Sequence, residues 1–431
     1  MGENSMAQHR IVPSIFDINL RPSTAALISL ALLAILLMVP SAQSRAQTFQ
    51  VIHNFTGGTD GAVPLAGLIA DRAGNLYGTA AAGGTGLFCE EYGCGTAFRL
   101  KPAGAGWVFA PLYEFQGGVN DAANPEARMV FAPNGVLYGT TEGGGIQNCG
   151  TVCGTVFQLT PPPTFCRSVL CPWDETVVYR FQGGPDAGSP SYGPLVVDQA
   201  GNLYGTSING GSDGYGDVYE LARSGSGWSE TLISNRFTSS PMSGVTFDHA
   251  GNLYGALEAG YDTTIYQLSP SGSGWQLNQI LTVDGQAQAG VIFDGAGNLY
   301  GTTADGETGG GGTVFELSAG NWNFSLLYSF SGNWGPRESL TMDSAGNLYG
   351  TTYEDGAYGR GSVFKLTPSA GGWVYTDLHD FTGGSDGSAP ISNVVIDARG
   401  NLYGSASRGG TGTNCYQGSS YGCGVVWEIA P

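Results

Sequence analysis

Carboxylates are the residues of this chain best suited to chemistry, and one set of them follows paired glycines. In the pattern Gly-Gly-x-Asp or a close variant, this set comprises Asp60, Asp121, Asp186 and Asp386. Carboxylate and carbonyl oxygens are the ligands that calcium prefers, so the set is a candidate calcium site, and no other cofactor is expected. The sequence favours a turn role for these residues over calcium binding, because glycine-flanked aspartate is an ordinary turn residue.

A second set of charged residues comprises Glu126, Arg128, Arg337 and Glu338, each at the start of a short apolar run. Two carboxylates on either side of a sugar can hydrolyse a glycosidic bond without a histidine. This set therefore leaves open a carboxylate-dependent hydrolase or lyase that acts on glycans. The alternative is that all four residues only line the rim of the fold.

The four histidines are poorly placed to act as a base. His9 lies in the N-terminal segment, and His249 lies in a turn. His53 and His379 stand where related segments carry tyrosine. Because a general base must reach the proton that it removes, this placement argues against histidine-based catalysis.

The elements that must position these residues come from a repeat, Asp-x-Ala-Gly-Asn-Leu-Tyr-Gly-Thr, first seen at residues 71–79. Seven copies, spaced by 46 to 66 residues, centre on Tyr77, Tyr138, Tyr204, Tyr254, Tyr300, Tyr349 and Tyr403. This period is typical of propeller blades. Each copy predicts a β-hairpin, with an aspartate that caps the turn in six of them. A regular acidic series of metal ligands is the alternative.

Each repeat predicts four antiparallel strands, A to D, which in the first repeat cover residues 65–70, 76–81, 95–100 and 107–115. A tryptophan recurs where strand D begins, and we expect it to pack between sheets. The seventh repeat lacks strand D, and residues 49–55 supply a matching strand. The sequence therefore predicts an all-β, closed seven-bladed β-propeller over residues 47–431, in which the N-terminal strand completes the last blade. An open solenoid is the alternative.

The repeats resemble those of the GloVer-containing tandem-repeat proteins, which are exported bacterial proteins. The resemblance covers residues 48–431 and rests on Phe-Thr-Gly-Gly-x-Asp-Gly (55–61 and 381–387), Ala-Gly-Asn-Leu-Tyr-Gly-Thr and Gly-Thr-Val-Phe-Glu-Leu (312–317). It implies a repeat and an export route but no reaction and no catalytic residues. Because the chain ends at Pro431 without a C-terminal anchor, we expect free secretion.

The first 46 residues read as a signal peptide, with arginines before an apolar run and small residues after it. An uncleaved anchor is the alternative. Eight cysteines follow in four close pairs, Cys89/Cys94, Cys149/Cys153, Cys166/Cys171 and Cys415/Cys423. An even number of paired cysteines beyond a signal peptide predicts disulfides, and hence a secreted or cell-surface protein.

The composition limits the classes of partner that the protein could bind. The 431 residues carry a formal net charge of −19, so binding to a nucleic-acid backbone is excluded as a role. No second long apolar segment is present, so we expect no membrane span in the mature form. We also expect a monomer.

The loops between strands D and A and those between strands B and C should share one face of the propeller. The loop from strand D to the next strand A leads into a blade, and we call it the entry loop of that blade. Gly-Gly-x-Asp entry loops and cysteine-containing loops cluster in blades 7, 1, 2 and 3, which we call the crescent. Decorated loops on a rigid scaffold are typical binding sites. The candidate binding residues are Glu90, Tyr92, Asp121, Glu142, Arg408, Tyr416 and Tyr421. The sequence thus favours a non-enzymatic propeller that binds an extracellular carbohydrate or protein, with the glycan-active enzyme as the alternative. Ordinary drift among the repeats would also account for these loops.

Overall fold

The computed structural model describes residues 47–431, apart from 90–91, 146–152, 164–172, 185, 191–192, 226, 235–236, 273, 307–309, 414 and 416–420. The chain divides into two units, Met1–Ala46 and Gln47–Pro431, and all described residues belong to the second. The predicted signal peptide, Glu90 and Tyr416 therefore lie outside the described residues.

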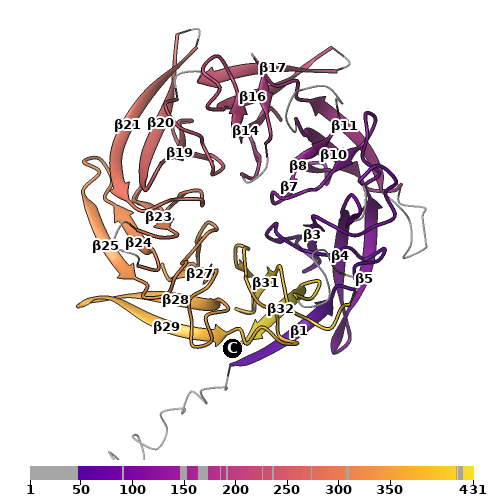
Figure 1. Cartoon of the computed structure of the whole chain (residues 1–431). Coiled ribbons are helices and arrows are strands. Elements are labelled where there is room, and N and C mark those ends of the chain that lie inside the picture. Colours follow the sequence, from indigo (N-terminus) through magenta and orange to yellow (C-terminus); the bar gives the residue numbers. More distant parts are fainter. Residues whose placement is uncertain are drawn as a thin grey trace, which may run out of the picture. The chain divides into compact units, whose positions relative to one another are not determined.

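Seven four-stranded antiparallel sheets form a ring in the second unit (Figure 1). Blade 1 consists of β2 (Ile69–Ala70), β3 (Leu76–Ala80), β4 (Thr96–Ala103) and β5 (Gly106–Glu114). Blade 2 consists of β7 (Val130–Phe131), β8 (Leu137–Thr141), β10 (Thr155–Thr160) and β11 (Asp174–Arg180), and blade 3 of β13 (Val196–Val197), β14 (Leu203–Ser207), β16 (Asp217–Ser224) and β17 (Gly227–Ser234). Blade 4 consists of β18 (Thr246–Phe247), β19 (Leu253–Ala259), β20 (Asp262–Ser271) and β21 (Gly274–Asp284).

Blades 5 to 7 consist of β22 (Ile292–Phe293), β23 (Leu299–Thr303), β24 (Thr313–Leu317) and β25 (Phe324–Ser329); β26 (Thr341–Met342), β27 (Leu348–Thr352), β28 (Ser362–Ser369) and β29 (Gly372–Asp380); and β30 (Val395–Ile396), β31 (Leu402–Ala406), β32 (Val425–Ala430) and β1 (Thr48–Asn54). The described residues contain no α-helix. In each blade the short strand A lies nearest the axis and strand D lies outermost (Figure 1).

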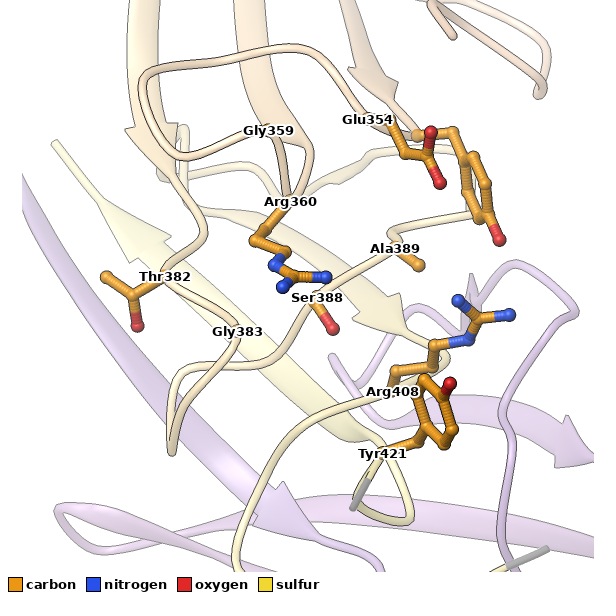
Figure 2. Close-up of a pocket in the computed structure, with 10 residues that line it drawn as sticks. Glu354, Gly359, Arg360, Thr382, Gly383, Ser388, Ala389, Arg408 and Tyr421 are labelled. Carbon is orange, nitrogen blue, oxygen red and sulfur yellow. The ribbon is translucent and has the colours of Figure 1, made fainter. Parts of the chain in front are cut away.

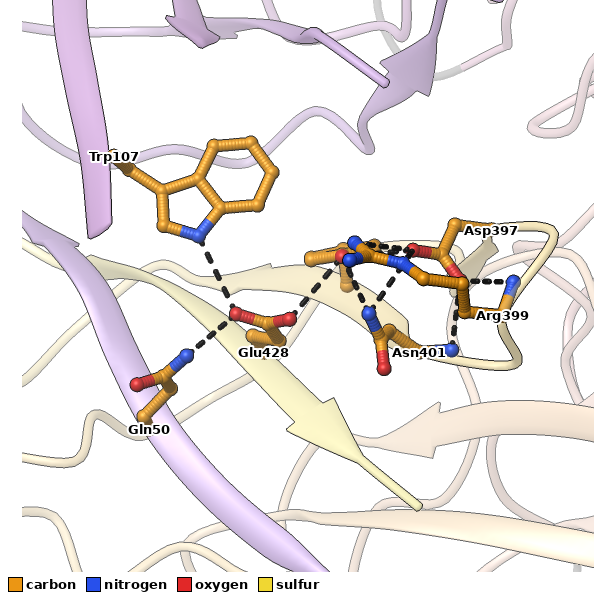
Figure 3. Close-up of polar contacts among 7 residues, drawn as sticks. Gln50, Trp107, Asp397, Arg399, Asn401 and Glu428 are labelled. Carbon is orange, nitrogen blue, oxygen red and sulfur yellow. Dashed lines mark hydrogen bonds and ion pairs between the residues drawn. The ribbon is translucent and has the colours of Figure 1, made fainter. Parts of the chain in front are cut away.

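The two ends of the repeat array pair with each other. Strand β1 runs antiparallel to β32, with Thr48 opposite Ala430 and Asn54 opposite Val425. Glu428 of β32 is buried, and its carboxylate accepts hydrogen bonds from Gln50 Nε2 (2.6 Å), Trp107 Nε1 (3.3 Å) and the Tyr403 hydroxyl (3.2 Å) (Figure 3). This group joins the first strand, the last strand and blade 1. The predicted closed propeller is confirmed.

The repeat aspartate caps its own hairpin, as the turn interpretation predicts. Asp294 Oδ1 accepts the N–H groups of Ala296 and Asn298, and Oδ2 accepts Asn298 Nδ2 and the Tyr300 hydroxyl. Burial opposes ionisation of Asp294, but the hydrogen bonds from Asn298, Ala296 and Tyr300 outweigh it and lower the pKa of the carboxyl group. The bond from the tyrosine explains why Tyr stands six residues after Asp in the repeat.

The repeat glycine leaves room for an aromatic ring on strand C. Gly301 pairs with Phe315, and a Cβ atom added at Gly301 would lie 2.5 Å from Phe315 Cζ. The corresponding glycine faces Trp427 in blade 7 and Tyr266 in blade 4. A fully buried ring cannot move away without strain, so each blade needs glycine at this position.

We expect Gly301→Ala to lower the free energy of unfolding by about 1–3 kcal/mol, because it overpacks the blade 5 core. Gly295→Ala in the turn of the same blade is the matched control, since a Cβ atom there would contact nothing within 4 Å. Urea unfolding of both variants provides the measurement. Equal midpoints for the two variants would contradict the steric role of Gly301.

The strand D tryptophans pack between neighbouring blades, as predicted. Each ring lies on the repeat tyrosine of the preceding blade: Trp107 lies 5.5 Å from Tyr403, and Trp373 lies 6.1 Å from Tyr300. The same contact occurs between Trp228 and Tyr138. These tryptophans are partly buried and pack against the cores of the blades, so their packing accounts for them without a ligand.

Candidate functional site

The entry loop of a blade and its B–C loop lie on the same face, as predicted. In blade 2, β6 (Ala122–Ala123) pairs with β9 (Gly143–Gly144). In blade 3, β12 (Ala187–Gly188) pairs with β15 (Asn209–Gly210). Isolated bridges make the same contact in blades 1, 4 and 7. We call this side of the propeller the loop face.

The crescent has a backbone feature of its own on this face. Five described non-glycine residues have positive φ, and four of them are Val63, Asn124, Ser189 and Ala389, each three residues after the aspartate of an entry loop. Such a conformation is unfavourable for a residue with a Cβ atom and persists only where the surroundings impose it. All four residues lie in the entries to blades 1, 2, 3 and 7, which are the blades of the crescent.

The same residues bind the B–C loop of the preceding blade. The N–H groups of Val63, Asn124 and Ser189 donate to the carbonyl oxygens of Cys423 (2.9 Å), Cys94 (2.8 Å) and Cys153 (3.0 Å). Each cysteine loop is therefore clamped to the entry of the next blade. The Ala389 N–H makes the same bond to the Arg360 carbonyl (2.9 Å) of blade 6, whose loop has no cysteine, so the clamp accompanies the entry motif and does not itself require a cysteine.

Two of the predicted disulfides are confirmed, Cys89–Cys94 and Cys415–Cys423. Cys153 is also disulfide-bonded. Cys149, Cys166 and Cys171 lie outside the described residues.

The Gly-Gly-x-Asp carboxylates are held within their own loops. Asp121 is 7% exposed and accepts the Gln116 N–H (2.8 Å), the Ala122 N–H (2.7 Å) and the Tyr113 hydroxyl (2.9 Å). Asp186 accepts the equivalent bonds from Gln182, Ala187 and Tyr179.

Asp60 and Asp386 instead accept hydrogen bonds from the N–H and hydroxyl groups of Thr56 and Thr382, and a histidine stands where Asp121 and Asp186 have a tyrosine. His53 Nε2 lies 3.4 Å from Asp60, and His379 Nε2 lies 3.3 Å from Asp386. Within the described ranges, no group of three or more His, Cys, Asp or Glu side chains could hold a metal ion. Calcium binding by Asp60, Asp121, Asp186 and Asp386 stays a prediction.

A cavity of about 560 Å³ opens on the loop face between blades 1 and 2. Glu126 and Glu142 line it together, although one follows the entry loop and the other follows strand β8. The Glu142 N–H donates to the Asn124 carbonyl (3.1 Å), which places Glu142 beside the segment that carries Glu126. Burial, and then the neighbouring Glu142 carboxylate, raise the pKa of Glu126 to about 8. The pair therefore holds a proton at neutral pH.

Aromatic rings complete this cavity. Phe88 and Tyr92, from the disulfide-bonded loop of blade 1, line it and are strongly exposed. The cavity thus combines two carboxyl groups with two rings that a ligand could contact. Of the predicted binding residues, Tyr92 and Glu142 meet here, while Asp121 does not line the cavity.

The exposed tyrosines gather on the same face. The exposed fractions range from 44% to 63%, and the residues are Tyr92, Tyr215, Tyr261, Tyr358 and Tyr421. Each lies between the second and third strands of its blade. Three of them were missed by the sequence analysis, because blades 3, 4 and 6 carry no cysteine in this loop. Aromatic exposure therefore extends beyond the crescent.

A smaller cavity, of about 170 Å³, lies between blades 6 and 7. It brings together two predicted residues, Arg408 and Tyr421, with Tyr353, Glu354 and Arg360 (Figure 2). Nothing in the sequence pointed to Arg360, because blade 6 lacks both the cysteine loop and the glycine-rich entry.

The axial charges form a separate group. Arg128 and Asn393 line a cavity of about 350 Å³ among the A strands. Burial lowers the pKa of Arg128, while the charge of Glu338 opposes this shift. Burial raises the pKa of Glu338 to about 7, against the effect of Arg128. Arg337 instead lies over the rings of Trp334 and Tyr353. The two predicted axial carboxylates therefore lie at different sites: Glu126 lies beside Glu142, and Glu338 lies beside Arg128.

The Gloeobacter/Verrucomicrobia repeat model matches residues 39–175, 90–263 and 258–431. The chain belongs to this repeat family. A comparison with curated proteins gives no match. None of the described residues form a helix long and apolar enough to cross a membrane.

Several solved structures resemble this member of the Gloeobacter/Verrucomicrobia repeat family. A putative 6-phosphogluconolactonase from Bacteroides fragilis NCTC 9343 is 11% identical, with 81% of this chain and 98% of that chain covered and a TM-score of 0.50. A putative 6-phosphogluconolactonase from Bacteroides uniformis ATCC 8492 is 15% identical (73% and 84% covered, TM-score 0.46). A chain of a nidogen/laminin complex is 16% identical (58% and 82% covered, TM-score 0.40). At these identities the likeness concerns the fold alone.

Proposed function

We propose that the propeller is exported and binds an extracellular carbohydrate on its loop face, without catalysing a reaction. The observation that carries this proposal is the cavity between blades 1 and 2, where the Glu126–Glu142 pair lies beside exposed rings of Phe88 and Tyr92. Carboxyl groups accept and donate hydrogen bonds to sugar hydroxyls, and an aromatic face packs against the C–H face of a sugar ring.

A carbohydrate fits this site better than a protein surface does. Specific polar groups in a concave, partly aromatic cavity are typical of small-ligand sites. A protein partner would instead require a broad interface with an apolar centre. The further exposed tyrosines of the B–C loops would allow a longer chain to extend across the same face.

We expect Tyr92→Ala and Glu142→Gln each to weaken oligosaccharide binding by about tenfold, because each removes one of the two kinds of contact. The measurement is a glycan array with residues 47–431, followed by titration calorimetry with the best oligosaccharide. His249→Ala is the control, since this exposed ring lies in an A–B turn at the other end of its sheet. Equal losses in the control and the two site variants would refute the site.

The second candidate is a glycan-active hydrolase or lyase, and the protonated state of Glu126 favours it. A carboxyl group with a raised pKa is suited to act as a general acid. However, the two carboxyl groups lie within hydrogen-bonding reach, which is closer than the about 5–5.5 Å of a retaining glycosidase. The geometry therefore favours binding without catalysis over a glycan-active enzyme. Release of reducing sugar by the native protein, lost in both Glu126→Gln and Glu142→Gln, would establish the enzyme instead.

A further inference from the structure

The cavity between blades 6 and 7 carries two arginines whose backbones are fixed by adjacent residues. The Ser388 N–H donates to the Arg408 carbonyl (2.9 Å), and the Arg408 N–H donates back to the Ser388 carbonyl (3.1 Å). The Ala389 N–H donates to the Arg360 carbonyl (2.9 Å). Arg360 and Arg408 therefore lie on either side of the same dipeptide, as Figure 2 shows.

The side chains are also positioned. The Arg408 guanidinium lies over the rings of Tyr421 (5.4 Å) and Tyr353 (5.9 Å). The stem of Arg360 runs beside Gly383, where an added Cβ atom would lie 3.3 Å from Arg360 Cγ. Contacts with a ring face hold a guanidinium in place while its N–H donors stay free at the edge.

Neither guanidinium forms an ion pair with a described residue. Among the described residues that line the cavity, Glu354 is the one carboxylate, so the two arginines leave an excess of positive charge there. This excess is unusual in a chain with 35 acidic and 16 basic residues. Two arginines free to donate hydrogen bonds into one small cavity match a planar oxyanion.

We propose that this cavity binds the carboxylate of a uronic acid residue in the carbohydrate ligand. The arginines would donate to the carboxylate oxygens, and the exposed Tyr421 ring would pack against the sugar. The inference rests on the proposed carbohydrate-binding function and adds the class of sugar, an acidic one. It also extends the binding surface from the crescent to blade 6.

The test is titration calorimetry with three trisaccharides of equal length, one of galacturonate, one of galactose and one of sulfated galactose, at low and physiological salt. We expect the native protein to prefer galacturonate. Arg360→Ala and Arg408→Ala should each weaken galacturonate binding about tenfold and leave galactose binding unchanged. Arg408→Lys should weaken it as well, because lysine keeps the charge but loses the bidentate donor geometry.

Three results would overturn the uronate inference: equal affinity for galacturonate and galactose, preference for the sulfated sugar, or full affinity in the exposed Arg360→Ala variant. If galactose binding then still depends on Tyr92, the proposed function stands without the inference. If galacturonate binding depends on both arginines but no sugar depends on Tyr92 or Glu142, the inference stands and the cavity between blades 1 and 2 is not the primary site.

Discussion

Replacing Trp427 by alanine is expected to lower the free energy of unfolding by about 3–5 kcal/mol, the range for a large buried aromatic side chain. Trp427 is fully buried on β32, the strand that pairs with both β31 and β1. Its ring packs near Phe381 (6.2 Å) and Phe49 (6.4 Å), which come from blade 6 and from the N-terminal strand. Truncation would therefore leave a cavity at the closure of the ring.

Trp427→Phe is the matched control. Four other blades carry phenylalanine at the equivalent position, namely Phe98, Phe157, Phe315 and Phe364. Trp427 Nε1 has no hydrogen-bond partner among the described residues, so the change removes no bond. We expect a much smaller loss for this variant in urea unfolding. A loss below about 1 kcal/mol for Trp427→Ala would show that the ring closes without this packing.

Raising the pH from about 5 to about 9 is expected to lower the melting temperature substantially. Burial raises the pKa of eight described carboxyl groups. Six of them reach a pKa of about 8 (Glu126), about 8 (Glu175), about 7 (Asp217), about 9 (Glu230), about 7 (Glu338) and about 6 (Asp377), and the other two are Glu258 and Glu316. The folded protein therefore keeps protons that the unfolded chain has lost. Between its unfolded pKa and its raised pKa, each such buried group contributes a slope of about −1.4 kcal/mol per pH unit, whereas the exposed Asp377 contributes less because solvent screens its charge.

Below pH 4 the stability is expected to change with pH in the opposite direction. Hydrogen bonds outweigh burial and lower the pKa of Asp60, Asp248, Asp294, Asp343 and Asp397. The stability that these carboxylates contribute is present above the ordinary aspartate pKa of 3.8 and is lost as the pH falls further. We therefore expect maximal stability at pH 4–5.

Glu230→Gln isolates one group of the alkaline limb. The pKa of Glu230 is raised first by burial and then by the neighbouring Asp186 carboxylate. The Tyr179 hydroxyl lies within hydrogen-bonding distance of both carboxylates. We expect this variant to melt at the native temperature at pH 5 and above it at pH 8.5. A native melting temperature that rises between pH 5 and 9, or an unchanged slope in the variant, would contradict this account.

Much of the fold could be predicted from the sequence because it depends on local patterns. The period of the repeat, the capping aspartate and the missing strand D all act within one blade or at the chain ends. The bond from Tyr300 to Asp294 and the contact between Gly301 and Phe315 were not predicted. They depend on strand register, which a one-dimensional pattern leaves open.

The site could be predicted only in part. Glu126 and Glu142 were assigned from sequence to different groups, because their proximity arises from the pairing of an entry loop with its own B–C loop. Arg360 was missed since its neighbour Ala389 belongs to the next blade. The clamps from Asn124 to Cys94 and from Ala389 to Arg360 also give the entry motif a structural role, with or without a cysteine in the neighbouring loop. The proposal of ligand binding therefore rests on the cavities and exposed rings.

The most direct test of the central claim is a crystal structure of residues 47–431 with the best oligosaccharide from the array. We expect the sugar in the cavity between blades 1 and 2, with one ring against Phe88 or Tyr92 and its hydroxyls bonded to Glu126 and Glu142. A sugar bound on the outer strands or at the A–B and C–D turns would contradict carbohydrate binding by the loop face.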